Sequence, residues 1–159
     1  MIYGYDFMEM RISTPTYEKI LADNPLGLQA AFGTLETEDR NLRYLEIGKD
    51  SLPLIVFIHG APSSSSFWRT FLRDSSLLGK AKLMAVDRPG FGYSGYGKPE
   101  ISVKEQAALI AEVIRQKQDK HPSVILHGSS YGGTVAARIA MDYPDLVDGL
   151  LLQSASMMP

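Results

Sequence analysis

Four short segments of the sequence are apolar at nearly every position. The clearest is residues 54–58, which read LIVFI. A strand with one face in water would alternate apolar and polar residues, whereas an uninterrupted apolar run is typical of a strand covered on both faces. The other three segments are residues 82–86 (KLMAV), 124–126 (VIL) and 149–152 (GLLL). We therefore expect a sheet that is buried between layers of helices.

Helical patterns lie between these segments. Residues 102–105 (SVKE) are predicted to form a capping box, in which the serine and the glutamate each satisfy a free amide at a helix start. An apolar stripe then continues to Ile114. Further helices are expected over residues 67–78 and 134–141, the latter ended by Pro144. Strands that alternate with helices predict a doubly wound α/β fold with a mostly parallel sheet.

One domain with a short lead-in is the expected organisation. The chain has 159 residues, the size of one domain. Residues 1–28 have weak periodicity and are interpreted as a lead-in with a short helix around residues 17–22. Residues 29–159 are interpreted as the core, which opens with a hairpin of strands at 29–37 and 42–47. The N-terminus has no long apolar stretch, so neither a secretory signal nor a membrane span is expected.

Composition excludes several function classes. The net charge of −2 gives no reason to expect nucleic acid or an anionic membrane as a partner. The chain has no cysteine, which excludes disulfides, thiolate metal sites and a cysteine nucleophile, and fits a cytoplasmic location. No cluster of histidine and acidic residues has metal-binding spacing, and no dinucleotide or Walker motif is present. We expect a small-molecule substrate, no metal and no cofactor.

A candidate nucleophile follows the apolar segment at 124–126. Residues 128–132 (GSSYG) match the pattern G-x-S-x-G, in which a serine sits on a strained turn between a strand and a helix. Glycines on either side let the strand and the helix approach, and the helix N-terminus favours a developing negative charge. Ser130 is the predicted nucleophile and Ser129 a spacer. The alternative is a small, polar loop with a structural role only.

A second loop could stabilise the oxyanion that forms when serine attacks a carbonyl. Such an oxyanion needs two hydrogen-bond donors. The backbone N–H of Tyr131, directly after the serine, is one candidate. The other is the N–H of Ala61 in the segment HGAP at residues 59–62, since Pro62 has no N–H. A plain strand-exit turn is the alternative interpretation of this segment.

Three motifs together resemble a known family. HGAPSSSSFW, DRPGFGYSG and HGSSYGG, in this order and spacing, are similar to the first part of an α/β-hydrolase of the HG-x-P type. The resemblance covers roughly residues 29–155. It implies that Ser130 is the nucleophile, that Ala61 and Tyr131 form the oxyanion hole, and that residues 87–95 form a structural turn. A serine at 130, rather than an aspartate, argues against the haloalkane dehalogenase and epoxide hydrolase branches, which the HG-x-P loop also resembles.

The partners of Ser130 are not evident in the sequence. In this family the order along the chain is serine, acid, histidine. No histidine follows Ser130, and the acids after it are expected at the opposite edge of the sheet, about 20 Å away. These acids are Asp142, Asp145 and Asp148.

The earlier histidines are weak substitutes for the missing base. His121 is expected at the wrong edge, and His127 inside a strand, where it packs against a neighbour. His59 is at the correct edge, but the resemblance gives it a role in shaping the loop; action as a base is the alternative. Arg88 could bind a carboxylate, although an ion pair or turn contact is preferred. Phe67 and Trp68 are expected to pack in the core rather than line an acyl pocket.

Two functional hypotheses follow. The first is a serine hydrolase acting on an ester, amide or similar carbonyl, with the general base and acid beyond residue 159. The resemblance implies that the last two strands and the lid of the family fold are also absent from this sequence. The second is a truncated, non-catalytic chain that pairs through its open sheet edge, with itself or with a partner, or is inert.

Overall fold

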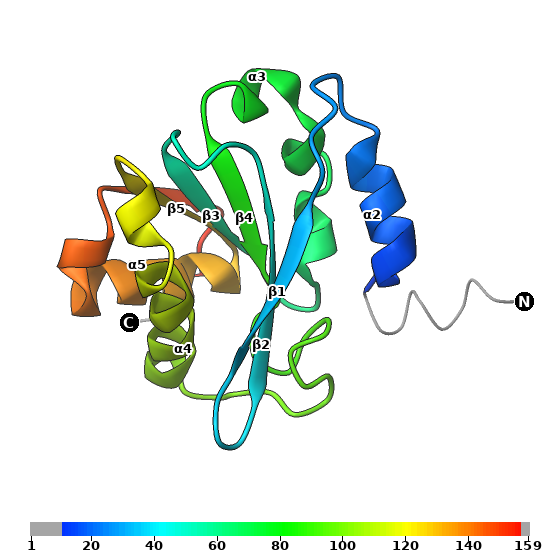
Figure 1. Cartoon of the computed structure of the whole chain (residues 1–159). Helices are drawn as coiled ribbons and strands as arrows, with labels where there is room; N and C mark the ends of the chain where they lie inside the picture. Colours follow the sequence, from blue (N-terminus) through cyan, green and yellow to red (C-terminus); the bar gives the residue numbers. More distant parts are fainter. Residues whose placement is uncertain (1–10, 157–159) are drawn as a thin grey trace, which may run out of the picture.

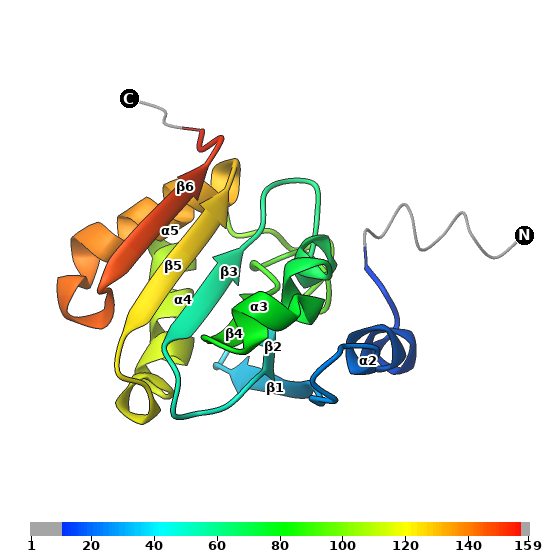
Figure 2. The ribbon, with the colours of Figure 1, turned by 90° about the horizontal axis from the view of Figure 1, so that it is seen from above.

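The structure is a computed structural model, and it describes residues 11–156. Six strands form one sheet in the order β1-β2-β4-β3-β5-β6, which Figure 2 shows from above. The first two strands make an antiparallel hairpin, and β2 also pairs antiparallel with β4. The other strands pair in parallel. The strands are β1 (Ala31–Glu36), β2 (Asn41–Ile47), β3 (Leu54–Ile58), β4 (Lys82–Val86), β5 (Val124–Ser129) and β6 (Gly149–Gln153).

Helices cover both faces of this sheet (Figure 1). One apolar core joins the sheet to α4 and α5, and a second joins the opposite face to α2 and the short helical turns after β3. The expected doubly wound α/β fold and the N-terminal hairpin are therefore confirmed. The helical elements are α2 (Thr14–Ala22), η1 (Ser65–Trp68), η2 (Phe71–Arg73), α3 (Ser75–Leu78), α4 (Val103–Arg115), η3 (Gln118–Lys120), α5 (Tyr131–Asp142) and η4 (Pro144–Leu146).

The single helix expected over residues 67–78 is wrong. The structure has two 3₁₀ turns and the short helix α3 instead. Asp74 adopts an extended backbone with φ of −69° and ψ of 115°, and its carboxylate accepts a hydrogen bond from the N–H of Leu77. A residue that caps a new helix interrupts the preceding one, so the segment cannot continue as a single helix.

The capping box at the start of α4 forms only in part. The Ser102 hydroxyl accepts from the N–H of Glu105 at 3.2 Å, as expected. The N–H of Ser102, however, donates to the carboxylate of Glu100 at 2.9 Å rather than to that of Glu105. The helix start is satisfied, but by a different acid than the pattern predicted.

The lead-in packs onto the domain. Tyr17 and Leu21 on α2 are buried in the second core, so residues from α2 belong to the same packed unit as the sheet. The first ten residues of the predicted lead-in and the last three of the predicted core, residues 1–10 and 157–159, lie outside the described residues.

Candidate active site

Ser130 lies between the end of β5 and the first residue of α5. Its backbone has φ of 51° and ψ of −125°, a region that residues other than glycine seldom occupy. The surrounding backbone holds this conformation. The N–H of Ser130 donates to the carbonyl of Gln153 at 2.9 Å, and its carbonyl accepts from Gly133 at 2.9 Å and Ser156 at 3.2 Å. The strain at Ser130 is thus sustained by fixed contacts with β6 and the residues after it.

Glycine is required on both sides of this turn. A Cβ at Gly128 would lie 2.5 Å from the carbonyl oxygen of Gly132, and one at Gly132 would lie 2.2 Å from the carbonyl oxygen of Ile58. Real Cβ atoms do not approach backbone so closely, so α5 can begin against β3 and β5 only because these side chains are absent. This is the steric role that the G-x-S-x-G pattern predicts.

The loop after β3 lies directly against Ser130. A Cβ placed at Gly60 would be 3.0 Å from the Ser130 Cβ and 3.6 Å from its Oγ. Ala61 directly follows Gly60, the residue that lies against Ser130. A cis peptide bond joins Ala61 to Pro62. Tyr131 is the first residue of α5, where a backbone N–H has no partner within the helix. The structure brings the two predicted oxyanion donors to the neighbourhood of the predicted nucleophile.

Arg88 fixes the start of this loop. Its guanidinium donates from Nε to the carbonyl of His59 at 2.8 Å and from Nη2 to that of Gly60 at 3.1 Å. Nη1 donates to the Gln106 side chain at 2.9 Å. The guanidinium also lies 4.8 Å from the ring centre of Tyr131. Arg88 is fully buried and makes turn contacts, in agreement with the preferred structural interpretation.

His59 has both ring nitrogens engaged. Its Nε2 lies 3.0 Å from the backbone N–H of Arg88, which can only donate, so Nε2 is an acceptor. The proton must then be on Nδ1, which donates to the carbonyl of Gly60 at 2.7 Å. Burial, and the nearby Arg88 cation, lower the pKa of His59 to about 3. The arrangement leaves no free nitrogen for a general base.

The other histidines are not positioned to serve Ser130. The His127 ring packs among aromatic rings, with centroids 5.4 Å from Phe57 and 4.9 Å from Trp68, as its structural interpretation predicted. His121 contacts the carbonyl of Leu52 at 2.8 Å, before β3 begins. Trp68 is fully buried as expected, whereas the expectation for Phe67 is wrong, since this ring is 48% exposed.

The acids after Ser130 lie away from it. Asp148 accepts from the N–H of Val124 at 2.8 Å, at the opposite end of β5 from Ser130. Asp142 ends α5 and pairs with Arg138, and Asp145 lies in η4. Within residues 11–156, no group of three or more histidine or acidic side chains is arranged to hold a metal ion.

The loop after β4 is organised around a buried carboxylate. Asp87 accepts from the N–H groups of Ser65 at 2.6 Å and Tyr93 at 2.9 Å, and burial raises its pKa. Ser94 donates to the Asp87 carbonyl at 2.7 Å. Gly92 is needed here, since a Cβ would lie 2.3 Å from the Asp87 carboxylate. Residues 87–95 thus form a tight turn beside the candidate site.

Two residues near the site were not indicated by the sequence. Gln106 holds the Arg88 guanidinium, and Tyr17 donates its hydroxyl to the carbonyl of Ser65 at 3.0 Å. Neither belongs to a motif, and Tyr17 is 48 residues from its partner.

In the part of the chain that the structure describes, no helix combines the length and apolar character needed to cross a bilayer.

Known proteins are similar to this chain in sequence and fold. Epoxide hydrolase 1 of Caenorhabditis elegans and a haloalkane dehalogenase of Bradyrhizobium diazoefficiens are each 33% identical over 112 residues, or 69% of this chain. The solved haloalkane dehalogenase DatA of Agrobacterium tumefaciens C58 has a TM-score of 0.69 and 26% identity, over 86% of this chain. The chain spans 27% and 34% of the two curated relatives and 43% of the solved structure.

The family model for the alpha/beta hydrolase fold matches residues 53–159, about two thirds of the sequence. The matched region contains the strained serine, the loop against it and the buried turn after β4. With this match and the shared fold, the chain belongs to the α/β-hydrolase family.

Proposed function

We propose that this chain carries the nucleophile and oxyanion hole of a serine hydrolase that acts on an ester, amide or similar carbonyl. The Ser130 Oγ attacks the carbonyl carbon and passes its proton to a general base. The N–H groups of Ala61 and Tyr131 stabilise the oxyanion, which collapses as the leaving group departs with a proton. Water then cleaves the acyl-enzyme ester and restores the Ser130 hydroxyl.

The observation that carries this proposal is the backbone of Ser130. A serine at φ of 51°, held by Gln153, Gly133 and Ser156, occupies a strained position of the kind that gathers at active sites. The Gly60 loop lies against its side chain, and the α5 N-terminus begins at the next residue. Strain, a neighbouring loop and a helix N-terminus in one place suit a nucleophile.

The general base and acid are proposed to come from sequence beyond residue 159. His59 has no free nitrogen, and His127 packs among aromatic rings. The acids after Ser130 lie at the far end of the sheet or on the surface of α5. We therefore expect the 159-residue chain to have little turnover, although an oxyanion hole without its base can retain some catalysis.

A carbonyl substrate fits Ser130 better than the substrates in the names of the two relatives. Attack by a carboxylate on an epoxide or a haloalkane leaves an ester, which water can cleave. Attack by a serine hydroxyl on the same substrates would leave an alkyl ether, which water does not cleave near neutral pH. The serine thus favours substrates that form an acyl-enzyme.

The test is covalent labelling with a fluorophosphonate, read by intact mass. The Oγ–P bond forms as fluoride leaves, and the phosphonyl oxygen takes the place of the oxyanion. We expect one adduct on the wild-type chain, none on Ser130→Ala, and an unchanged adduct on Ser129→Ala, the adjacent serine. The general base is expected outside this chain, so labelling is measured at alkaline pH, where hydroxide can remove the Ser130 proton. A folded chain, by circular dichroism, that gains no adduct even there would overturn the proposal, as would an adduct that survives in Ser130→Ala.

A second candidate is a non-catalytic chain that acts by pairing. The observation that favours it is β6, whose side chains Leu150, Leu151 and Leu152 are 38%, 52% and 42% exposed. An apolar edge strand is a template for association. This candidate predicts a folded chain that associates but is inert toward the fluorophosphonate.

A further inference from the structure

The segment of residues 11–22, here called the N-terminal strap, reaches two loops of the candidate site. Tyr17 on α2 is buried, and its hydroxyl donates to the carbonyl of Ser65 at 3.0 Å. Ser65 begins η1, directly after the loop that carries Ala61. Arg11 donates to the carbonyl of Gly92 at 3.3 Å, in the turn after β4. The strap therefore contacts the β3 loop and the β4 loop at once.

The backbone of Ser65 is held from two sides. Its carbonyl accepts from Tyr17, and its N–H donates to the buried carboxylate of Asp87 at 2.6 Å. The same carboxylate accepts from the N–H of Tyr93. The position of Ser65 is thus set jointly by the strap and by the β4 loop.

The loop between His59 and Ser65 consequently has an anchor at each end. Arg88 holds the carbonyls of His59 and Gly60 at the start, and Tyr17 with Asp87 holds Ser65 at the finish. Ala61 lies between the two anchors. The direction of its N–H depends on both, since a short loop with fixed ends has few conformations.

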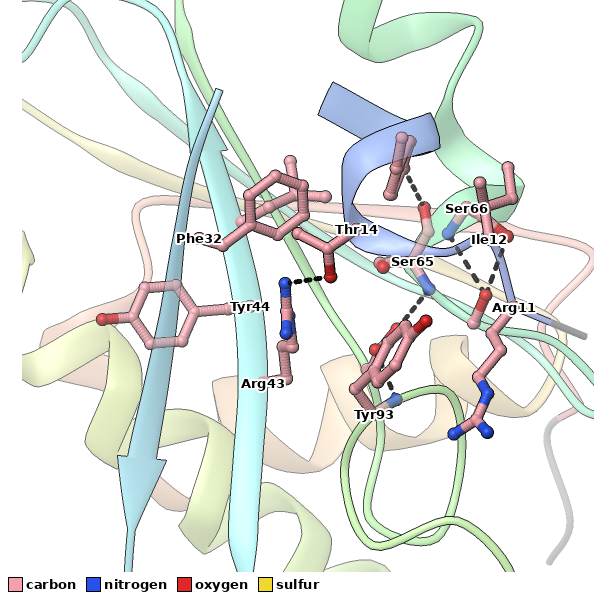
Figure 3. Close-up of a pocket in the computed structure, with 13 residues that line it drawn as sticks. Arg11, Ile12, Thr14, Phe32, Arg43, Tyr44, Ser65, Ser66 and Tyr93 are labelled. Carbon is pink, nitrogen blue, oxygen red and sulfur yellow. Dashed lines mark hydrogen bonds between the residues drawn. The ribbon is translucent and has the colours of Figure 1, made fainter. Parts of the chain in front are cut away.

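The surroundings of the second anchor are closely packed. The strap, the two loops and strands β1 and β2 line a small cavity of about 10 Å³, about the space of one water molecule. Figure 3 shows Ser65, Arg43 and Thr14 around it, with Arg43 donating to the Thr14 hydroxyl at 2.9 Å. The guanidinium of Arg11 lies 4.8 Å from the ring centre of Tyr93. Without the Tyr17 hydroxyl, the Ser65 carbonyl would move or accept from a single confined water, and neither holds it to α2.

We propose that Tyr17 is a positioning residue of the oxyanion hole: through Ser65, the N-terminal strap sets the loop that carries the Ala61 N–H. The effect of Tyr17 on catalysis rests on the proposed serine-hydrolase function. Its effect on the position of the loop does not depend on that function. Transition-state donors act only at correct geometry, and displacements of about 1 Å reduce rates by about 100-fold. Tyr17 touches no substrate and acts through Ser65 alone.

The first test is amide hydrogen exchange, which needs no activity. In Tyr17→Phe we expect faster exchange in peptides covering residues 59–68, with exchange in β5 and α5 unchanged. Tyr143→Phe removes a tyrosine hydroxyl on the α4 side of the sheet and should alter neither region. Unchanged exchange at residues 59–68 in a folded Tyr17→Phe, or equal acceleration throughout the chain, would overturn the proposal.

The second test is the rate of fluorophosphonate labelling at increasing reagent concentration. Tyr17→Phe should lower the maximal labelling rate by about tenfold or more while the half-saturating concentration stays the same. Tyr143→Phe should label as wild type does. Labelling of Tyr17→Phe at the wild-type rate would refute the catalytic consequence. If wild type itself gains no adduct even at alkaline pH, the serine-hydrolase function fails, and the exchange result alone decides whether the strap positions the loop.

Discussion

At the scale of single residues, the candidate site is built from polar groups that are already paired. His59 donates to Gly60 and accepts from Arg88, and Arg88 in turn donates to His59, Gly60 and Gln106. Buried polar groups that are fully satisfied hold a unique geometry, whereas a charged imidazole in the same place would be unpaired at Nε2. The network therefore requires His59 to be neutral.

His59 should make the stability of the fold depend on pH. Its pKa is about 3 in the folded chain, against an ordinary value of 6.5. The stabilisation that comes from the neutral His59 imidazole is complete above pH 6.5. It is lost as the pH falls from 6.5 toward 3, because the imidazole of the unfolded chain binds a proton at higher pH than that of the folded chain. The free energy of unfolding should fall by up to about 1.4 kcal/mol per pH unit in this window.

Urea unfolding at several pH values checks this dependence. His59→Gln keeps a hydrogen-bond acceptor within reach of the Arg88 N–H but does not titrate, so its stability should fall less steeply with acid than that of wild type. The difference between the two slopes isolates His59 from the carboxylates. Parallel slopes would show that the imidazole is not held neutral.

At the scale of elements, the junction of β5 and α5 decides whether Ser130 can be presented. Gly132→Ala would place a Cβ 2.2 Å from the carbonyl oxygen of Ile58 and 2.5 Å from that of His59. In an exposed helix the same change is favourable by about 1 kcal/mol. Here we expect destabilisation of about 1–3 kcal/mol, because rigid backbone must move apart.

A matched change in β6 provides the control for that measurement. A Cβ at Gly149 would first meet the Ile125 side chain at 3.3 Å, which can adjust. Denaturant unfolding should therefore find Gly149→Ala closer to wild type than Gly132→Ala. A Gly132→Ala chain as stable as wild type would mean that α5 is not packed against β3 as described.

Sequence patterns were sufficient where a local rule decides the element. Uninterrupted apolar runs located β3, β4, β5 and β6, although only the first three are buried and β6 is exposed. The serine flanked by glycines located the turn at Ser130. The segment at 67–78 was misjudged because its apolar spacing suits a helix, while the Asp74 cap interrupts it. Contacts between distant segments carry no such pattern, so neither Tyr17 at Ser65 nor Gln106 at Arg88 could be foreseen.

At the scale of the whole molecule, the sheet has two unlike ends. Each edge strand has one strand neighbour among the described residues, but β1 mixes exposed and half-buried residues, whereas residues 150–153 of β6 are all exposed. On β6, Leu151 is paired in register with His127, whose ring belongs to the cluster of Phe57 and Trp68. Leu151 thus lies on the face of this aromatic cluster, whereas Leu150 and Leu152 point to the opposite face. Exposed apolar side chains on an edge strand favour association.

The purified 159-residue chain should accordingly self-associate through β6. Leu151→Lys places a charge at a leucine that is 52% exposed, and should weaken association by about tenfold or more, since burying one leucine is worth about 1.5–3 kcal/mol. Ile101→Lys makes the same change at a residue that is 89% exposed, just before α4, and should leave association intact. Sedimentation velocity over a range of concentrations measures both. A wild-type chain that stays monomeric, or an equal loss in Ile101→Lys, would show that β6 is not the contact.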